Sequence, residues 1–339
     1  MMVKQGFIVH HVMNESLTSH GPENKAAGPS PETGIDLQHI LAPVDFSTAS
    51  QHGLAFAGAL AEKFHSRVQL LHVVEPPVLP EWGYAHLSRR EAKLRRAAED
   101  RLPRLPSECG LNPSVIQSAD IRSGEAGDQI CQAAAEGHSD LIVLASHGLG
   151  GLQHAFTGST AERGVRHAPC PVLTVRDSAL RKQGAGTPGF ALKRILVTTD
   201  FSEESKKAFP YAVAFARKFE ATLILLYVVP AHLPAEFGDV GIVLEEKHLL
   251  EEARARLPHF RQAELDPHLH VDTLVSNGSP AQDVCRTAES QGADLIVMAT
   301  HGHTGLKHFM LGSVTESVVR QAPCPVLIVR EREHDFVNG

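Results

Sequence analysis

The chain has 339 residues, of which 42% are hydrophobic and 21% charged, with a formal net charge of −7 at pH 7. This composition is typical of a globular protein, and the length predicts two domains of ordinary size. The negative charge argues against binding to nucleic acid, because such proteins usually present a basic face. No apolar run approaches the roughly 20 residues that span a bilayer, and no secretory signal is expected.

Apolar runs alternate with amphipathic segments along the chain, which predicts strands alternating with helices. In the first half, strands are expected at 39–44, 68–74, 115–121, 141–145 and 172–175, with helices at 48–64, 88–101, 128–136 and 159–167. In the second half, strands are expected at 194–198, 222–229, 269–275, 294–299 and 326–329, with helices at 203–219, 243–257, 281–290 and 313–321. Such continuous Val/Ile/Leu strands indicate parallel sheets covered on both faces, so we predict two tandem doubly wound α/β domains of five strands each.

Several motifs occur twice, about 155 residues apart. An Asp-Phe-Ser motif at 45–47 returns at 200–202, and an Ala-Pro-Cys-Pro-Val-Leu run at 168–173 returns at 322–327. A repeat of this length indicates a duplicated whole domain rather than a short solenoid repeat. The predicted organisation is a disordered N-terminal tail (1–35), a first domain (36–177), a linker (178–190), a second domain (191–331) and a C-terminal tail (332–339).

The five cysteines and the histidines lack the spacing of a disulfide framework or a metal site. We therefore expect buried free thiols in a reducing cytoplasm, and no resident metal. The histidine group at 301, 303 and 308 is only partly repeated in the other half, which argues against a metal site there.

Each half carries an aspartate after its first strand and a glycine loop after its fourth strand. Asp45 and Asp200 therefore fall on the same sheet edge as their glycine loops, where doubly wound folds bind ligands. Gly148 and Gly302 allow close backbone approach. Gly158 and Gly312 directly precede helices, whose N-termini favour phosphate.

Ser159 with Glu162, and Ser313 with Glu316, have the spacing of a capping box, which predicts that each helix begins at the serine. The simpler interpretation of these loops is an ordinary strand-to-helix turn. The recurrence of the loop together with an aspartate favours an anion site.

The loop spacing and the accompanying Asp-Phe-Ser and Pro-Cys-Pro-Val motifs resemble those of universal stress proteins, over about 36–177 and 191–331. The resemblance implies a tandem member with an adenine nucleotide α-hydrolase-like fold that binds ATP, with Mg²⁺ as a candidate companion. By position, it places adenine contacts on Val73 and Val228. It places phosphate contacts on Gly148, Gly158, Ser159 and Thr160, and on Gly302, Gly312, Ser313 and Val314. In the family the final strands pair across a dimer interface. Here the two domains are expected to form an intramolecular pseudo-dimer, and whole chains are candidates for a homodimer.

The two copies depart from the family motif and from each other. Its first glycine is Ala145 in one half and Ala299 in the other. The insert of the second loop contains Lys307 and His308, whereas the first insert offers only His154. Because a triphosphate needs counter-charge, we expect the second domain to bind ATP at least as well as the first.

The leading functional hypothesis is a cytoplasmic ATP-binding stress-response protein that acts as a nucleotide-dependent regulatory module for unknown protein partners. No catalytic residue is predicted, because the hydroxyl groups of the site have no evident activating base. Two alternatives remain open: a slow ATPase, and a scaffold or dimerisation protein with vestigial nucleotide pockets.

Overall fold

The computed structural model describes residues 35–75, 84–145, 164, 166–176, 190–231, 240–300, 312–330, 333 and 335–337. The side chains of 84–89 and 240–246 are not described. The expected N-terminal tail and linker therefore lie almost entirely outside the described residues, as does most of the helix expected at 159–167.

The strands of the first half form a parallel sheet with doubly wound topology. They are β1 (His39–Pro43), β2 (Arg67–Val74), β3 (Ile116–Ser123), β4 (Leu141–Ala145) and β5 (Val172–Val175). The order β3-β2-β1-β4-β5 places β1 between β2 and β4, so the order of strands reverses there. β4 and β5 are almost fully buried, as expected for strands covered on both faces.

The second half repeats this arrangement. Its strands are β6 (Arg194–Thr199), β7 (Thr222–Pro230), β8 (Val271–Gly278), β9 (Leu295–Ala299) and β10 (Val326–Val329). They lie in the order β10-β9-β6-β7-β8, with every pair parallel. The prediction of two five-stranded parallel sheets is confirmed.

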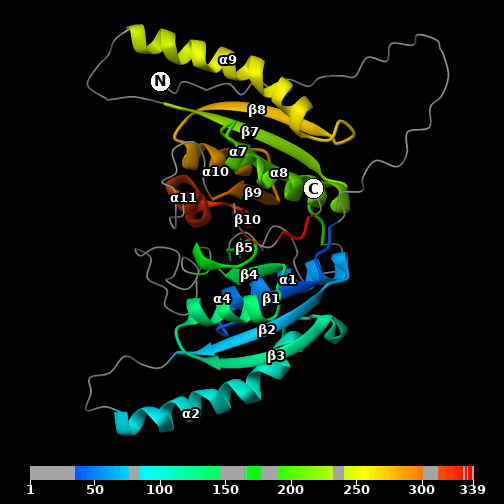
Figure 1. Cartoon of the computed structure of the whole chain (residues 1–339), viewed down its shortest axis with the longest axis vertical. Coiled ribbons are helices and arrows are strands. Elements are labelled where there is room, and N and C mark those ends of the chain that lie inside the picture. Colours follow the sequence, from blue (N-terminus) through cyan, green and yellow to red (C-terminus); the bar gives the residue numbers. More distant parts are fainter. Residues whose placement is uncertain are drawn as a thin grey trace, which may run out of the picture.

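The two sheets join through one antiparallel pair, β5 with β10, which makes a single ten-stranded sheet (Figure 1). Leu173 lies opposite Leu327, and Thr174 lies opposite Val326. The Thr174 hydroxyl also donates to the Val326 carbonyl oxygen at 3.3 Å. The two final strands thus pair within one chain, as the intramolecular pseudo-dimer required.

Helices cover both faces of the sheet. In the first half they are α1 (Thr48–Phe64), α2 (Tyr84–Arg101), α3 (Leu105–Glu108) and α4 (Ala126–Glu136), with 3-10 turns at Leu102–Arg104 and Pro113–Val115. In the second half they are α7 (Glu203–Lys206), α8 (Ala208–Phe219), α9 (Val240–Glu264), α10 (Pro280–Ser290) and α11 (Ser313–Gln321). α2 and α9 lie at opposite ends of the molecule (Figure 1).

Each face of the sheet has its own hydrophobic core, and each core draws on both halves. One core includes Phe56 of α1 and Phe215 of α8, and the other includes Ile130 of α4 and Val318 of α11. Both cores therefore continue across the junction of β5 with β10, which removes apolar surface from water in both halves together.

Two helices of the second half differ from their predicted bounds. The helix expected at 203–219 is interrupted at Lys207, because Pro210 has no N–H to donate to the carbonyl of residue 206. The helix expected at 243–257 continues to Glu264 despite Pro258. Buried Leu257 and the packing of Phe260 against the core favour this continuation over the local preference of proline.

On one side of the sheet, equivalent residues of α1 and α8 meet. The rings of Phe64 and Phe219 lie 5.9 Å apart. The ammonium group of Lys63 lies 5.3 Å from the Phe219 ring, and that of Lys218 lies 5.4 Å from the Phe64 ring. Because each contact is matched by its equivalent, the interface has the self-complementary character of a two-fold dimer.

On the other side, two arginines after the final strands cross between the halves. Arg176 donates to the Ala322 carbonyl oxygen at 3.2 Å, and Arg330 donates to the Ala168 carbonyl oxygen at 2.6 Å. These donors satisfy carbonyl groups next to the repeated Pro-Cys-Pro motifs, so each half stabilises the loop that precedes the other's last strand.

The C-terminal segment also connects the halves. Ile35 forms an antiparallel bridge with Val337, and the N–H of Asp36 donates to the Phe336 carbonyl oxygen at 2.8 Å. The Phe336 ring is only 2% exposed and packs edge-on against Tyr211 at 4.9 Å. Residues 335–337 thus belong to the core that the two halves share.

We expect Phe336→Ala to lower the free energy of unfolding by about 3–5 kcal/mol, because it leaves a cavity beside Tyr211. Chemical denaturation measures the change. Leu249→Ala serves as the control, since Leu249 is 42% exposed and its truncation should change stability by less than about 0.5 kcal/mol. An equal effect of the two variants would contradict the packing.

The buried carboxyl group of Glu333 should make the stability of the protein depend on pH. Its Oε1 accepts the Arg330 N–H at 2.9 Å, whereas its buried Oε2 has no hydrogen-bond partner among the described residues. Burial raises the pKa of Glu333 from 4.5 to about 8, although the Arg330 N–H and guanidinium oppose this. The folded protein then holds a proton that the unfolded chain releases, so stability should fall as pH rises from about 4.5 to about 8.

Glu333→Gln should remove this component of the pH dependence, because glutamine stays neutral. The difference in unfolding free energy between the native chain and the variant, measured from pH 5 to pH 9, should shift steadily in favour of the variant up to about pH 8. A difference that is independent of pH would refute the assignment.

Candidate functional site

In each half, the candidate site lies where the strand order reverses. Asp45 follows β1 and Ala145 ends β4, and these two strands are neighbours. Asp200 and Ala299 occupy the corresponding places after β6 and in β9. The carboxyl ends of parallel strands at such a reversal form the usual ligand crevice of this architecture.

The two candidate sites lie at opposite edges of the sheet. β5 and β10 are antiparallel, whereas all strands within a half are parallel. The carboxyl ends of β1–β5 therefore point the opposite way from those of β6–β10, and each half has a site of its own.

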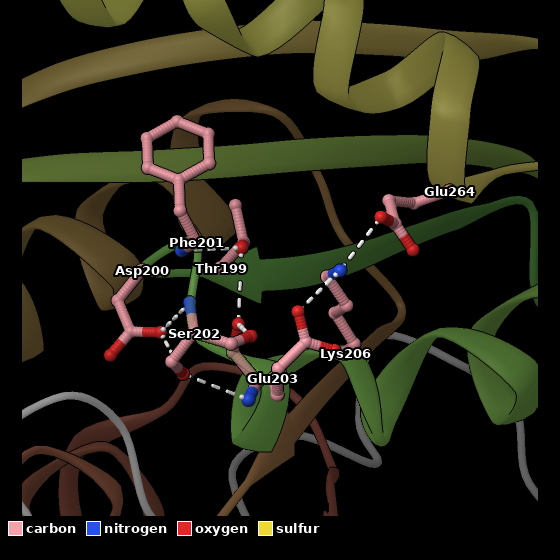
Figure 2. Close-up of polar contacts among 8 residues, drawn as sticks. Thr199, Asp200, Phe201, Ser202, Glu203, Lys206 and Glu264 are labelled. Atoms are coloured by element: carbon pink, nitrogen blue, oxygen red, sulfur yellow. Dashed lines mark hydrogen bonds and ion pairs between the residues drawn. The ribbon is translucent and has the colours of Figure 1, made fainter.

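In the second half, Asp200 is held in a tight turn (Figure 2). Its Oδ1 accepts the Ser202 N–H at 3.0 Å and also accepts the Ser202 hydroxyl. The Phe201 N–H donates to Thr199 Oγ1 at 3.0 Å, and Ser202 Oγ accepts the Ser205 N–H at 3.1 Å, which caps α7. These bonds orient the carboxylate from the backbone of its own turn.

The first half makes the same turn with one difference. Asp45 Oδ1 accepts the Ser47 N–H at 2.9 Å, and Ser47 Oγ accepts the Ser50 N–H at 3.1 Å, which caps α1. The residue before the aspartate is Val44 rather than threonine, and the Ser50 hydroxyl accepts the Asp45 N–H at 3.3 Å instead. The aspartate of each site thus lies two residues before the N-cap serine of a helix, in the turn that leads into that helix.

The phenylalanine after each aspartate adopts a left-handed backbone conformation. The φ angle is 63° at Phe46 and 64° at Phe201. This region is unfavourable for a bulky residue by about 1–3 kcal/mol, so surrounding contacts must hold it in place. Sequence reasoning missed this strain, although the Asp-Phe-Ser motif itself was recognised.

The predicted adenine contacts lie near the ends of β2 and β7. Val73 and Val228 are both half-buried and pack on the core that contains Ile130 and Val318. Each is an apolar side chain that is partly available at the edge of the sheet. These two residues are accessible enough to contact a ligand.

Glycines stand where the outermost strands end, Gly124 directly after β3 and Gly278 as the last residue of β8. Gly124 and Gly278 have φ angles of 143° and 150°, which only glycine adopts readily. At position 278 a Cβ would also lie 2.1 Å from Asp283 Oδ2. Both positions therefore require glycine.

Most of the glycine loop lies outside the described residues, namely 146–163 and 301–311. This includes the predicted phosphate contacts Gly148, Gly158, Ser159, Thr160 and Gly302. The second loop is described where it returns to the sheet. There, Gly312 donates its N–H to the Thr300 carbonyl oxygen at 3.0 Å, and the Thr300 N–H donates to the Val329 carbonyl oxygen at 2.9 Å.

The helix after the second loop begins at Ser313, as predicted, but the capping box expected there is not formed. Gly312 is the N-cap residue and Ser313 is the first helical residue, without a side-chain capping bond. Glu316 pairs with Arg320 at 2.8 Å instead of reaching back. The close backbone contact with Thr300 sets the start of α11, and Thr315 Oγ1 ties its first turn to the Ala299 carbonyl oxygen at 3.0 Å.

The N-terminal turn of α11 is accessible. Ser313 is exposed and Val314 is 36% exposed at the first turn of this helix. A helix N-terminus attracts anions through the backbone N–H groups of its first turn and the helix dipole. The described part of this loop therefore keeps the chemistry expected of a phosphate contact.

The cysteines are suited to a structural rather than a reactive role. All five cysteines are free. Cys170 and Cys324 are buried as expected, whereas Cys109, Cys131 and Cys285 are only half-buried. Burial raises the pKa of the Cys131 and Cys285 thiols to about 11, which keeps them protonated at neutral pH. Within the described ranges, no group of three or more His, Cys, Asp or Glu side chains could hold a metal ion.

Comparison with known proteins gives a direct assignment of the family. The sequence profile described as the universal stress protein family matches residues 37–176 and again residues 191–330. The chain belongs to the universal stress protein family.

Individual relatives agree with this assignment. A universal stress protein of Methanocaldococcus jannaschii is 37% identical over 143 residues, which cover 41% of this chain and 82% of the relative. One from Mycolicibacterium smegmatis is 26% identical over 303 residues, covering 86% of this chain and 97% of the relative. The crystal structure of a universal stress protein from Archaeoglobus fulgidus superposes with a TM-score of 0.60 at 20% identity, covering 88% of this chain and 98% of that one.

The tandem architecture is thus shared along nearly the whole length of the M. smegmatis universal stress protein. In the part of the chain that the structure describes, no helix is long and apolar enough to cross a membrane.

Gly312 yields a test of the loop geometry. A Cβ at this position would lie 2.7 Å from the Thr300 carbonyl oxygen, so the backbone must move to accept it. We expect Gly312→Ala to destabilise the protein by about 1–3 kcal/mol in chemical denaturation.

Gly53→Ala is the matched control, because its Cβ would meet Ala145 N at an ordinary 3.7 Å. That substitution lies inside helix α1 and should be neutral or stabilising, since alanine is a better helix former than glycine. Destabilisation by Gly53→Ala with no effect of Gly312→Ala would show that the contact with Thr300 does not require glycine.

Proposed function

We propose that each half of this universal stress protein binds ATP, and that nucleotide occupancy regulates contacts with other proteins in a cytoplasmic stress response. The observation that supports this most strongly is the repeated Asp-Phe-Ser turn. In both halves it presents a carboxylate at the strand-order reversal, next to the strand that leads into the glycine loop.

The described side chains suit a nucleoside. Asp45 and Asp200 are acceptors for the hydroxyl groups of a ribose, and their turns already orient them. Val73 and Val228 offer half-buried apolar surface to an adenine ring. An apolar wall with a few oriented polar groups is the usual composition of a small-molecule site.

The phosphates are assigned to the glycine loops. In the first half the proposed contacts are Gly148, Gly158, Ser159 and Thr160, and in the second they are Gly302, Gly312, Ser313 and Val314. The accessible first turn of α11 supports the last three of these. Mg²⁺ would supply further counter-charge to a bound triphosphate.

The described site chemistry favours binding over catalysis. The hydroxyl of Ser202 bonds to Asp200 and accepts from Ser205, which is a structural role in the turn. A slow ATPase and a scaffold with vestigial pockets are the competing functions, and both make distinct predictions about the nucleotide.

The protein should be purified without added nucleotide, denatured, and the released small molecules identified by mass spectrometry. Released ATP supports the proposed module. ADP together with steady phosphate release supports the ATPase. No released nucleotide and no thermal shift with Mg-ATP would leave the scaffold as the better account.

Asp45→Asn and Asp200→Asn should each weaken ATP binding to their own half, by roughly tenfold or more, because a charged acceptor is replaced by a neutral one. Asparagine keeps the oxygen that accepts the serine N–H, so the turn itself is preserved. Isothermal titration with Mg-ATP measures both sites, and Asp100→Asn on exposed helix α2 is the control.

The same two variants allow the ATP affinities of the two sites to be compared. Because Lys307 and His308 lie in the second loop, the site that remains in Asp45→Asn should bind ATP at least as tightly as the site that remains in Asp200→Asn. The opposite ranking would contradict the assignment of counter-charge to the second loop.

A further inference from the structure

An arginine from a long outer helix lies against the left-handed phenylalanine in each half. The Arg101 guanidinium of α2 is 4.7 Å from the Phe46 ring centroid, and the Arg256 guanidinium of α9 is 4.2 Å from that of Phe201. The two arginines are 155 residues apart, as are the two aspartates. The same contact therefore occurs at equivalent positions in both halves.

The second strand of each half contacts the same ring. Phe46 lies 4.5 Å from the His72 ring, and Phe201 lies 4.5 Å from the Tyr227 ring. In the second half, Phe260 also packs edge-on against Phe201 at 5.0 Å. Each phenylalanine ring is thus held by a strand residue and by an arginine from a helix.

Each phenylalanine ring is held between its arginine and its strand residue, an arrangement that we call the clamp. The clamp explains how the strained backbone conformation of the phenylalanine persists. A phenylalanine at a φ of 63° or 64° would relax to a right-handed conformation if its ring were released. That relaxation would rotate the preceding peptide and move the aspartate carboxylate. The ring therefore couples the arginine to the carboxylate, since the contact described between each arginine and the turn is with the phenylalanine ring.

We infer that Arg101 and Arg256 are positioning residues of the two nucleotide sites, each fixing the left-handed phenylalanine and through it the carboxylate of Asp45 or Asp200. The inference rests on the proposed nucleotide function. It assigns helices α2 and α9 a role in that function, because each helix supplies the side chain that holds the carboxylate in its binding orientation.

The second half has an additional connection between α9 and the turn. Lys206 of α7 bonds both to Glu203 and to Glu264 at the end of α9, at 2.8 Å in each case (Figure 2). Its ammonium group also lies 5.7 Å from the Phe260 ring. The position equivalent to Lys206 in the first half is Gln51, so the clamp of the second half is the more extensive one.

The test is a double-mutant cycle in the second site, measured by Mg-ATP titration in an Asp45→Asn background that weakens the first site. Arg256→Met keeps an unbranched apolar side chain but removes the cation. We expect it to weaken ATP binding roughly two- to fivefold, in line with the strength of such contacts at an exposed arginine. Arg254→Met, an exposed arginine of the same helix, should leave binding unchanged.

The second arm of the cycle is Phe201→Gly, which tolerates the left-handed conformation but has no ring to clamp. In this background Arg256→Met should cause no further loss, because the arginine acts through the ring. An equal loss in both backgrounds would mean that Arg256 contacts the nucleotide directly, and it would overturn the inference. Unchanged binding by Arg256→Met would overturn it as well.

The outcomes separate this inference from the proposed function. If the native chain binds ATP but Arg256→Met binds equally well, only the positioning role fails. If the native chain binds no nucleotide, the proposed function fails and the positioning role with it. Arg101→Met with Arg96→Met as its control, titrated in an Asp200→Asn background, repeats the test in the first half.

Discussion

The antiparallel pairing of β5 with β10 is the contact on which the rest of this molecule depends. Each strand has only four residues and is fully buried, so either one alone would leave an apolar sheet edge open to other chains. Their pairing removes both edges and merges two parallel sheets into one. The Phe64–Phe219 contact on one face and the arginine crossings on the other are arranged about the same junction.

This pairing also determines how the two candidate sites relate to each other. Because the halves run in opposite directions, their strand-order reversals open at opposite sheet edges, and each half presents its own Asp-Phe-Ser turn. The universal stress protein fold is thus used twice in one chain, in a pseudo-symmetric arrangement. The copies are not identical, since Thr199 and Lys206 support the second turn where Val44 and Gln51 stand in the first.

Much of the fold could be predicted because its signals are local. Apolar patterning predicted all ten strands, as continuous runs in the central strands and as mixed segments in β3 and β8. The repeat marked Asp45 and Asp200 as equivalent positions and Gly312 as the end of the second loop. α11 begins at Ser313 as predicted, but the capping bond expected of this serine is absent, because Gly312 is the N-cap residue and lies in close backbone contact with Thr300. The interruption at Lys207 was missed although Pro210 signals it, and the continuation of α9 past Pro258 depends on core contacts that no local pattern reveals.

The sequence by itself determined the strand and helix order, the duplication, the family and the residues that begin each candidate site, since all of these are carried by spacing along the chain. Only the tertiary structure decided which face of the molecule joins the halves and how each aspartate is held. Arg101 meets Phe46, and Arg256 meets Phe201, across more than fifty residues of chain. Such contacts leave no periodic pattern, because their partners are brought together only when the helices pack on the sheet.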